Sequence, residues 1–160
     1  GSESYPVLTS LDELVATVGA ALAPHLASNA DFGELQLVGA SHVQCAIFPG
    51  DGGKYGAHFD GDGLTTRMTM IVYTSSDWQE ADGGELCVLD EKERCWRALP
   101  PREDTLLIFR SESVLHQVRP SYAGSRLALT AFFTVGRGQK QLFATARNAD
   151  RYLEQDDAEY

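Results

Sequence analysis

Apolar residues near the start of the chain recur every three or four positions, as on one face of an amphipathic helix. Ser10 followed by Glu13 has the pattern of a capping box, so we expect the helix to begin at Ser10. Pro24 is expected to end or kink it. The apolar face predicts that this helix packs against a sheet; its residues are Leu11, Leu14, Val15, Val18 and Leu22.

From Glu34 onward the pattern changes to short apolar or alternating runs that are separated by Gly, Asp and Pro. Turns are expected at Pro49–Gly53 and Asp82–Gly84. Eight short strands at this spacing predict a mainly β domain, either a sandwich or a jelly roll, with one supporting N-terminal helix. The predicted strands are Glu34–Val38, His42–Phe48, Tyr55–Phe59, Arg67–Tyr73, Glu85–Leu89, Thr105–Phe109, Val114–Val118 and Arg126–Thr134.

The composition narrows the class of protein. The chain has 160 residues, of which 43% are hydrophobic and 22% charged, as expected for a single globular domain over residues 1–160. Its formal net charge of -10 disfavours binding to a phosphate backbone, so we expect no nucleic-acid partner. No apolar run approaches the ~20 residues of a membrane span, so we expect no membrane partner either.

The cysteines and the two ends of the chain carry weaker signals. Cys45, Cys87 and Cys95 form an odd set without CxxC spacing, which predicts free thiols and a reducing compartment. Cys87 and Cys95 bracket a polar run that is expected to form a hairpin tip. Gly1-Ser2 is typical of the remnant of a removed tag, so we expect the native N-terminus to lie elsewhere. The polar segment 136–160 is expected to be a surface helix or a frayed end without a site.

Two histidines and one aspartate are the candidate metal ligands. His58 and Asp60 are two positions apart in a predicted strand, so their side chains share one face of it. His116 lies in another predicted strand. Two imidazoles and one carboxylate form the facial triad that binds iron(II) and leaves three positions open. The helical HExxH motif of many zinc hydrolases is absent from the sequence.

Arg126 is the candidate anion-binding residue. Alternation along the last predicted strand places it on the same face as Ala128, Thr130 and Phe132. An arginine that points into a β-structure is costly unless it meets an anion. That anion could be a structural carboxylate or a dicarboxylate cosubstrate, and the neighbouring triad favours the cosubstrate.

The region from Gln44 to Phe133 resembles the 2-oxoglutarate- and iron(II)-dependent dioxygenases, specifically the prolyl 4-hydroxylase group. Single segments are weak matches, but their order along the chain is specific. The matching segments are Phe48–Gly50, Tyr55–Asp60, Arg67–Tyr73, Asp77-Trp78, Gly83–Leu86, Pro101–Phe109, His116–Pro120 and Arg126–Phe133.

This resemblance implies a double-stranded β-helix, or jelly roll, with residues 44–134 as its core. It implies iron binding by His58, Asp60 and His116, with no further acid or base needed for catalysis. It also implies contacts with a peptide substrate at Tyr55, at the mouth of the site, and at Arg67, on the rim. The residues implied to bind 2-oxoglutarate are Arg126, Tyr73, Ile71, Leu86, Val118 and Thr130.

The implied reaction is hydroxylation of a proline at its 4-position in a protein substrate. It consumes O2 and 2-oxoglutarate, yields succinate and CO2, and takes ascorbate as reductant. The resemblance is greatest to the oxygen-sensing enzymes, in which the substrate is a transcription factor or a ubiquitin-ligase adaptor. It implies a cytoplasmic or nuclear monomer.

The sequence departs from the family pattern in two places. Phe48 stands where the oxygen-sensing hydroxylases usually have tyrosine, so cosubstrate affinity and oxygen handling are expected to differ from theirs. The chain before Gln44 is short, so substrate-gripping loops of larger relatives are expected to be missing. Arg126 itself agrees with the oxygen-sensing and bacterial enzymes, since the collagen-modifying branch tends to use lysine.

The sequence leaves other functions open. A nucleic-acid demethylase of the same superfamily would have a second arginine six residues after Arg126, where this chain has Phe132. A dioxygenase acting on a small molecule is a further alternative. A non-catalytic jelly-roll binding domain would bind no iron, and a cupin-like isomerase or storage protein would bind metal without forming succinate.

Overall fold

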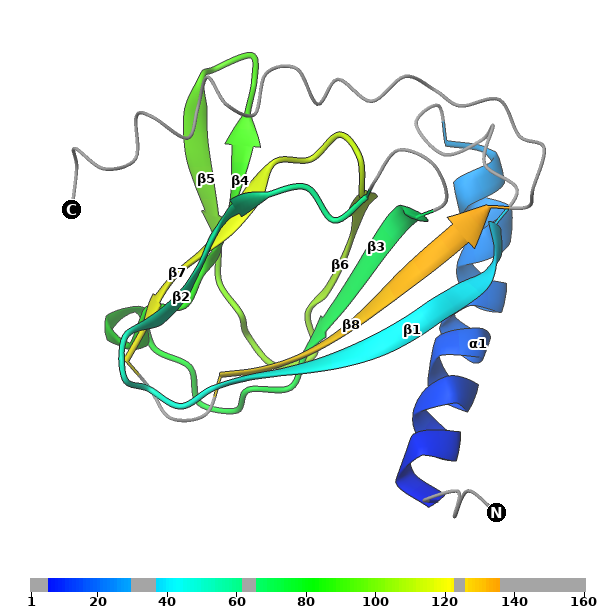
Figure 1. Cartoon of the computed structure of the whole chain (residues 1–160), viewed down its shortest axis with the longest axis horizontal. Coiled ribbons are helices and arrows are strands. Elements are labelled where there is room, and N and C mark those ends of the chain that lie inside the picture. The colour runs from blue at the N-terminus through cyan, green and yellow to red at the C-terminus, as the bar shows by residue number, and fades with distance from the viewer. Residues whose placement is uncertain (1–5, 30–36, 62–65, 123–125, 136–160) are drawn as a thin grey trace.

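The computed structural model describes residues 6–29, 37–61, 66–122 and 126–135. This described part contains the helix α1 (Pro6–Ala27), the short 3-10 helix η1 (Glu80–Asp82) and eight strands (Figure 1). The strands are β1 (Leu37–Phe48), β2 (Gly53–His58), β3 (Thr66–Tyr73), β4 (Leu86–Asp90), β5 (Cys95–Leu99), β6 (Leu106–Arg110), β7 (His116–Ser121) and β8 (Arg126–Val135).

Within the described residues, the strands form two four-stranded antiparallel sheets that face each other. The order is β1-β8-β3-β6 in the first sheet and β2-β7-β4-β5 in the second. Apart from the β4–β5 hairpin, successive strands alternate between the sheets, which is the topology of a double-stranded β-helix. The expected jelly roll is thereby confirmed.

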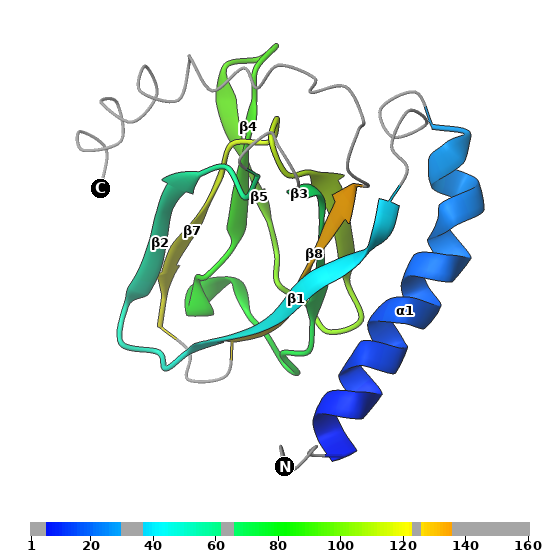
Figure 2. The same cartoon turned by 45° about the vertical axis from the view of Figure 1, so that its right-hand side comes forward.

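Helix α1 lies along the outer face of the β1-β8-β3-β6 sheet, as expected (Figure 2). Strands β3 and β8 are largely covered on both faces because one face meets the helix and the other faces the second sheet. The cluster beneath the helix includes Val15, Met68, Met70, Ala131 and Phe133. The cluster between the sheets includes Ile71, Tyr73, Leu86 and Ala128.

The helix has different ends from those predicted. It begins at Pro6 rather than at Ser10, since proline fits the first position of a helix, where no N–H partner is needed. It continues to Ala27, with Pro24 inside its last turn. Of the two expected effects of Pro24, an end or a kink, the end is wrong, because the helix continues for three residues beyond it.

Two strand predictions also need correction. One continuous strand, β1, replaces the two predicted before Pro49, and its register shifts between Ala40 and His42 mark the point where the pattern is interrupted. Strand β5 was missed because it is an edge strand with mostly exposed residues, which leaves little hydrophobic alternation.

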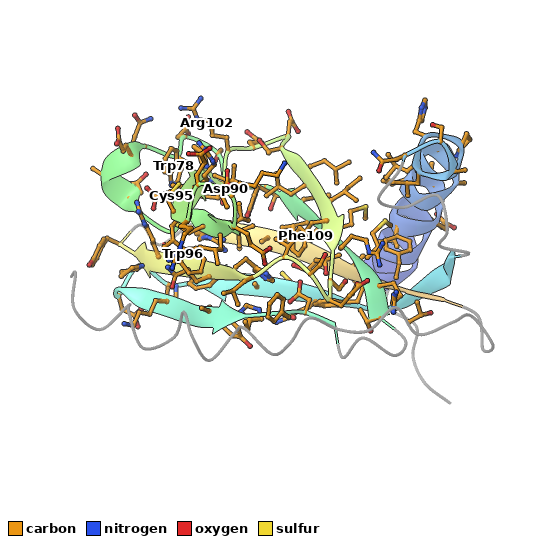
Figure 3. The ribbon with its side chains drawn as sticks, turned by 90° about the horizontal axis from the view of Figure 1, so that it is seen from above. Trp78, Asp90, Cys95, Trp96, Arg102 and Phe109 are labelled. Carbon is orange, nitrogen blue, oxygen red and sulfur yellow. The ribbon has the colours of Figure 1, made fainter. Side chains whose placement is uncertain are left out.

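The β4–β5 hairpin confirms the expected polar tip (Figure 3). Cys87 is buried opposite Ala98, whereas Cys95 is exposed opposite Asp90, so the two thiols do not face each other. All three cysteines lie in the described ranges and none of them forms a disulfide, as predicted.

No helix in the described part of the chain is long and apolar enough to cross a membrane. The expectation for residues 136–160 and the first three residues of the first predicted strand fall outside the described residues.

Candidate active site

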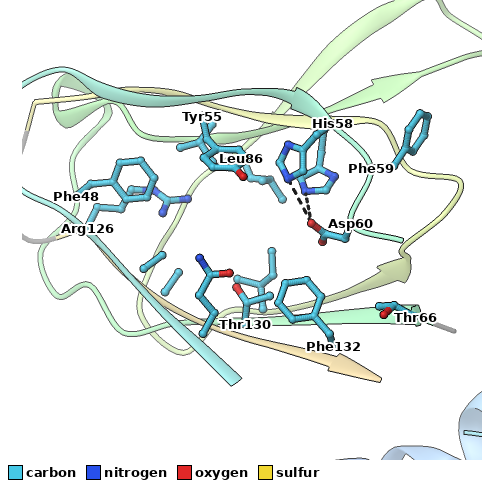
Figure 4. Close-up of a pocket in the computed structure, with 16 residues that line it drawn as sticks. Phe48, Tyr55, His58, Phe59, Asp60, Thr66, Leu86, Arg126, Thr130 and Phe132 are labelled. Carbon is cyan, nitrogen blue, oxygen red and sulfur yellow. Dashed lines mark ion pairs between the residues drawn. The ribbon is translucent and has the colours of Figure 1, made fainter. Parts of the chain in front are cut away.

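A cavity of about 330 Å³ opens between the two sheets (Figure 4). It brings together residues that are far apart in the sequence, because β2, β7 and β8 contribute to one interior. Nine of the expected site residues line it: Tyr55, His58, Asp60, Ile71, Leu86, His116, Val118, Arg126 and Thr130. Sequence reasoning assigned no site role to the lining residues Gln44, Ala46, Phe59, Thr66, Ala128 and Phe132.

The three candidate metal ligands converge at one place in this cavity. His58 ends β2 and is the cross-strand partner of His116, which begins β7. Asp60 follows β2 after one intervening residue. One ligand atom from each of the three side chains lies within 4.8 Å of those of the others. The β2–β7 pair therefore brings the two predicted histidines together, and Asp60, which was expected in the strand of His58, joins them from the segment just after β2.

Backbone carbonyls orient both imidazole rings. Nδ1 of His58 lies 2.8 Å from the carbonyl oxygen of Gly56, and Nδ1 of His116 lies 3.0 Å from that of Val114. A carbonyl oxygen only accepts hydrogen bonds, so each Nδ1 is the donor. Each Nε2 is thereby left to face the centre as a potential metal ligand.

Asp60 divides its two oxygens between different partners. Oδ1 lies 3.2 Å from Nε2 of His58 and 3.5 Å from Nε2 of His116. Oδ2 accepts a hydrogen bond of 2.8 Å from the Thr69 hydroxyl. Burial alone would raise the pKa of Asp60, but hydrogen bonds from His116 and His58 hold it well below its usual range. Asp60 is therefore ionised in the pH range of ordinary assays.

The environment of His58 has two opposing effects on its pKa. Burial lowers the pKa, but hydrogen bonds to Asp60 and Gly56 outweigh it, so the net shift is upward. The ring lies edge-on to Tyr55, with centroids 4.5 Å apart.

The Nε2 atoms of His58 and His116 converge on the Asp60 carboxylate, and this arrangement of lone pairs requires a proton or a cation among them. A divalent cation fits this donor set, and two imidazoles with one carboxylate suit iron(II).

Arg126 lies at the other end of the cavity, beside Phe48 (Figure 4). Its side chain is 4% exposed, and Nε donates a hydrogen bond of 2.6 Å to the carbonyl oxygen of Gly84. The guanidinium carbon is 4.5 Å from the centre of the Phe48 ring. Burial lowers the pKa of Arg126, while Tyr73 acts in the opposite direction.

Arg126 forms no ion pair with any carboxylate among the described residues. This observation disfavours a structural carboxylate as its partner, one of the two anions left open by the sequence. A guanidinium keeps its charge even when buried, and a buried charge without a counter-ion is costly. The site therefore suits an anion that enters from the cavity.

Tyr73 supplies a hydroxyl at the same end of the fold. It is fully buried, its ring centre is 5.4 Å from the Arg126 guanidinium carbon, and its hydroxyl has no hydrogen-bond partner in the described part of the chain. Burial raises the pKa of Tyr73 to about 12, against the opposing effect of Arg126. The phenol thus remains a donor at neutral pH, although Tyr73 is not among the residues that line the cavity.

The turn Gly83-Gly84 brings the backbone close to Arg126. The indole of Trp78 donates to the carbonyl oxygen of Gly83, and the N–H of Gly84 donates to the carbonyl oxygen of Pro120. Gly84 has φ +76°, a conformation that favours glycine. A Cβ on Gly84 would lie 2.7 Å from Cδ of Arg126. Gly84 therefore leaves the space that the arginine side chain occupies.

We expect Gly84→Ala to displace Arg126. The added methyl group and the positive φ should cost about 1–3 kcal/mol of folding free energy. Displacement of the guanidinium should also weaken 2-oxoglutarate binding by roughly tenfold or more, the worth of one charge-assisted hydrogen bond. Thermal unfolding and calorimetric titration with 2-oxoglutarate would measure the two effects.

Gly56→Ala is the matched control, since a Cβ there would meet no atom within 4 Å. We expect it to unfold and bind as the parent does. Equal 2-oxoglutarate affinities in the Gly84 and Gly56 variants would contradict the role assigned to the Gly84 turn.

The two expected substrate contacts differ in their placement. Tyr55 is 56% exposed and lines the cavity, consistent with a position at its mouth. Arg67 does not lie on the rim, so that expectation is wrong. Its side chain is buried, with Nε 3.3 Å from Oε1 of Glu112. Alternation on β3 turns it inward with Thr69, where a carboxylate neutralises it.

Thr69 and Ser111 were missed by the sequence analysis. Thr69 lies between expected site residues on β3, and its inward face was a signal for a contact with the triad. Ser111 lies in a turn 42 residues away from Thr69, and nothing in the sequence pattern linked it to the site.

Comparison with known proteins agrees with this geometry. Residues 42–134, more than half of the chain, match the family model of the 2OG-Fe(II) oxygenase superfamily. The chain belongs to this superfamily. A "Hypoxia-inducible factor prolyl hydroxylase" of Caenorhabditis elegans is 30% identical over 115 residues, which is 70% of this chain and 16% of that protein. The chain thus spans about a sixth of the length of this relative.

Two solved structures share the fold. One is a prolyl-4-hydroxylase of Pseudomonas putida, with TM-score 0.68 and 23% identity, covering 84% of this chain and 70% of that one. The other is a prolyl hydroxylase of Trichoplax adhaerens in complex with a peptide of the hypoxia inducible factor, with TM-score 0.66 and 25% identity, covering 77% and 56%. These matches confirm the resemblance to the prolyl 4-hydroxylase group of 2-oxoglutarate oxygenases that the sequence suggested.

Proposed function

We propose that this protein is a 2-oxoglutarate-dependent prolyl 4-hydroxylase that acts on a proline-containing protein substrate. The reaction would consume O2 and 2-oxoglutarate and release succinate and CO2. We further propose that residues 44–134 form the core of a single catalytic domain.

One observation carries the proposal: a buried arginine that has no carboxylate partner among the described residues shares a cavity with a candidate metal-binding triad. 2-Oxoglutarate has a carboxylate at each end. Arg126 would bind the distal carboxylate through its planar fork of donors, with the Tyr73 hydroxyl as a further donor. The keto acid end would then lie toward His58, Asp60 and His116. The apolar side chains of Ile71, Leu86 and Val118 line the space between.

Each group of residues would have a separate task. When bound, iron(II) and 2-oxoglutarate supply oxygen activation and decarboxylation, which no protein side chain can provide. The two histidines and Asp60 would hold the metal with three positions left open. Arg126 would fix the direction in which the cosubstrate enters, and the apolar walls would exclude water from the reacting centre.

The choice of a proline in a protein rests on the relatives. Tyr55 lies at the mouth of the cavity, where a peptide would first make contact. We propose that the substrate is a transcription factor or a ubiquitin-ligase adaptor in an oxygen-sensing pathway, because one relative is named for the hypoxia-inducible factor and another is a prolyl hydroxylase in complex with a peptide of that factor. The proposal includes ascorbate as reductant and a monomer in the cytoplasm or nucleus, where the three cysteines, which form no disulfide, would stay reduced.

Heavy-isotope oxygen tests this function and its substrate together. The protein would be incubated with iron(II), 2-oxoglutarate, ascorbate, labelled O2 and a cell lysate from its source organism, followed by mass spectrometry of tryptic peptides. We expect label on a proline, absent from a His58→Ala control. Succinate without a labelled peptide would move the substrate to a small molecule or a nucleic acid. Absence of metal binding and of succinate would leave a non-catalytic binding domain.

A further inference from the structure

The metal-binding carboxylate is supported from behind by two buried hydroxyl groups. Oδ2 of Asp60 accepts from Oγ1 of Thr69 at 2.8 Å, and Oγ1 of Thr69 lies 2.8 Å from Oγ of Ser111. Thr69 and Ser111 are both fully buried. We call these two residues the Asp60 support.

The direction of the hydrogen bonds in this support follows from the number of protons. An ionised carboxylate can only accept, so the single hydroxyl proton of Thr69 must go to Asp60. Thr69 is then the acceptor for Ser111, and the chain runs from Ser111 to Thr69 to Asp60. Hydrogen bonds in such a chain polarise and strengthen one another in a buried setting.

Backbone contacts fix the same three segments relative to one another. Ser111 donates its N–H to the carbonyl oxygen of Arg67 on β3, and it accepts the N–H of Gly61 next to Asp60. A Cβ on Gly61 would lie 2.7 Å from the carbonyl oxygen of Thr66, so this approach requires glycine. Ser111 therefore holds both the aspartate loop and the strand that carries Thr69.

A buried ion cluster lies directly beside the support. Glu112, which follows Ser111, pairs with Arg67 from β3 and with Arg110 from β6. The glutamate side chain is 5% exposed. This cluster ties the Ser111 turn to β3 and keeps it in place.

We propose that Thr69, backed by Ser111, is the positioning residue of the metal centre: it holds Oδ2 away so that Asp60 presents only Oδ1 to a bound cation. Oδ1 is the oxygen that lies 3.2 Å and 3.5 Å from the two Nε2 atoms. A carboxylate that gave both oxygens would occupy an additional position. Only two positions of an octahedral ion would then remain, whereas bidentate 2-oxoglutarate and O2 together need three. This inference rests on the proposed function.

Two matched pairs of variants isolate the hydroxyl from the rest of the side chain. Thr69→Val keeps the shape of threonine and removes only the hydroxyl. Thr69→Ser and Thr69→Ala both lose the methyl group, and only the serine keeps the hydroxyl. The second pair preserves the comparison if the valine variant does not fold.

The measurement is calorimetric titration of the metal-free full chain with Mn(II) alone. We expect the Kd to rise about 10- to 100-fold in the valine and alanine variants, the usual effect of losing a group that orients a metal ligand. The serine variant should remain close to the parent. Ser75→Ala, which removes a buried hydroxyl that bonds to the backbone of Leu127, should lower thermal stability without changing the Kd.

The outcomes separate this inference from the proposed function. The parent and the Thr69→Val, Thr69→Ala and Thr69→Ser variants could all bind Mn(II) with the same affinity. That result would overturn the positioning role and leave the proposed function intact. Equal losses of Mn(II) affinity in Thr69→Ser and Thr69→Ala would also overturn it, because the hydroxyl would then have no effect. Failure of the parent to bind Mn(II) or iron(II) would overturn both.

Discussion

Arg126→Ala is expected to raise the Kd for 2-oxoglutarate by about 100- to 1,000-fold, equivalent to about 3–4 kcal/mol of binding free energy. The reason is that the guanidinium is 4% exposed and has no carboxylate partner among the described residues, so a bound dicarboxylate would be its counter-ion. Titration of the manganese-loaded protein with 2-oxoglutarate measures the effect without turnover. Arg126→Lys should show an intermediate loss, since lysine keeps the charge but not the planar fork.

Arg97→Ala is the control for the loss of a positive charge. Arg97 is 57% exposed and pairs with Asp90 on the surface, so its removal should leave the Kd for 2-oxoglutarate unchanged. A folded Arg126→Ala protein with the parent's affinity would contradict the assignment of the carboxylate site. Succinate formation at saturating 2-oxoglutarate should recover in part, because the metal ligands are untouched.

His58→Ala and Asp60→Ala are expected to abolish turnover. Each removes one of three ligands, and even residues that only orient a ligand typically change metal affinity 10- to 100-fold, so we expect a loss of more than about 100-fold. Asp60→Ala should have the larger effect, because it removes the only negative charge of the triad. Calorimetry with Mn(II) and an assay of succinate would measure binding and turnover separately.

His25→Ala provides the matched histidine control. His25 is exposed in the last turn of α1, away from the cavity, so we expect unchanged metal binding and turnover. Metal affinity that survived in both His58→Ala and Asp60→Ala would refute the triad as the metal site. Loss of turnover with intact metal binding would instead place the defect in oxygen or substrate handling.

The accuracy of the strand predictions depended on burial. Strands β3 and β8 were predicted almost to the residue because both faces are covered and their apolar runs are long. Edge strand β5 was missed because exposure on both sides leaves no alternation to detect. The start of α1 was misplaced because Ser10 and Glu13 have a capping pattern that the chain does not use, Pro6 being the first helical residue.

The candidate site also contains residues that were predicted correctly and residues that were not. The facial triad was predictable because His58 and Asp60 have the HxD spacing and because metal binding restricts the residue types, although Asp60 lies just after β2 and not in the strand. The inward face of Arg126 followed from alternation along β8. The burial of Arg67 against Glu112 did not follow, since an ion pair between β3 and a turn 45 residues later depends on how the two segments fold together.

The sequence by itself determined the local features of this protein: the mainly β character, the metal-binding residue types and the inward arginine. Local features follow from side-chain periodicity and from the chemistry of single residues, both of which can be read along the chain. Only the tertiary structure decided that Arg126 lacks a carboxylate partner in the described part, that Thr69 and Ser111 support Asp60, and that Gly84 leaves room for the arginine. These are contacts between segments that are distant in the sequence, and their geometry exists only once the two sheets face each other.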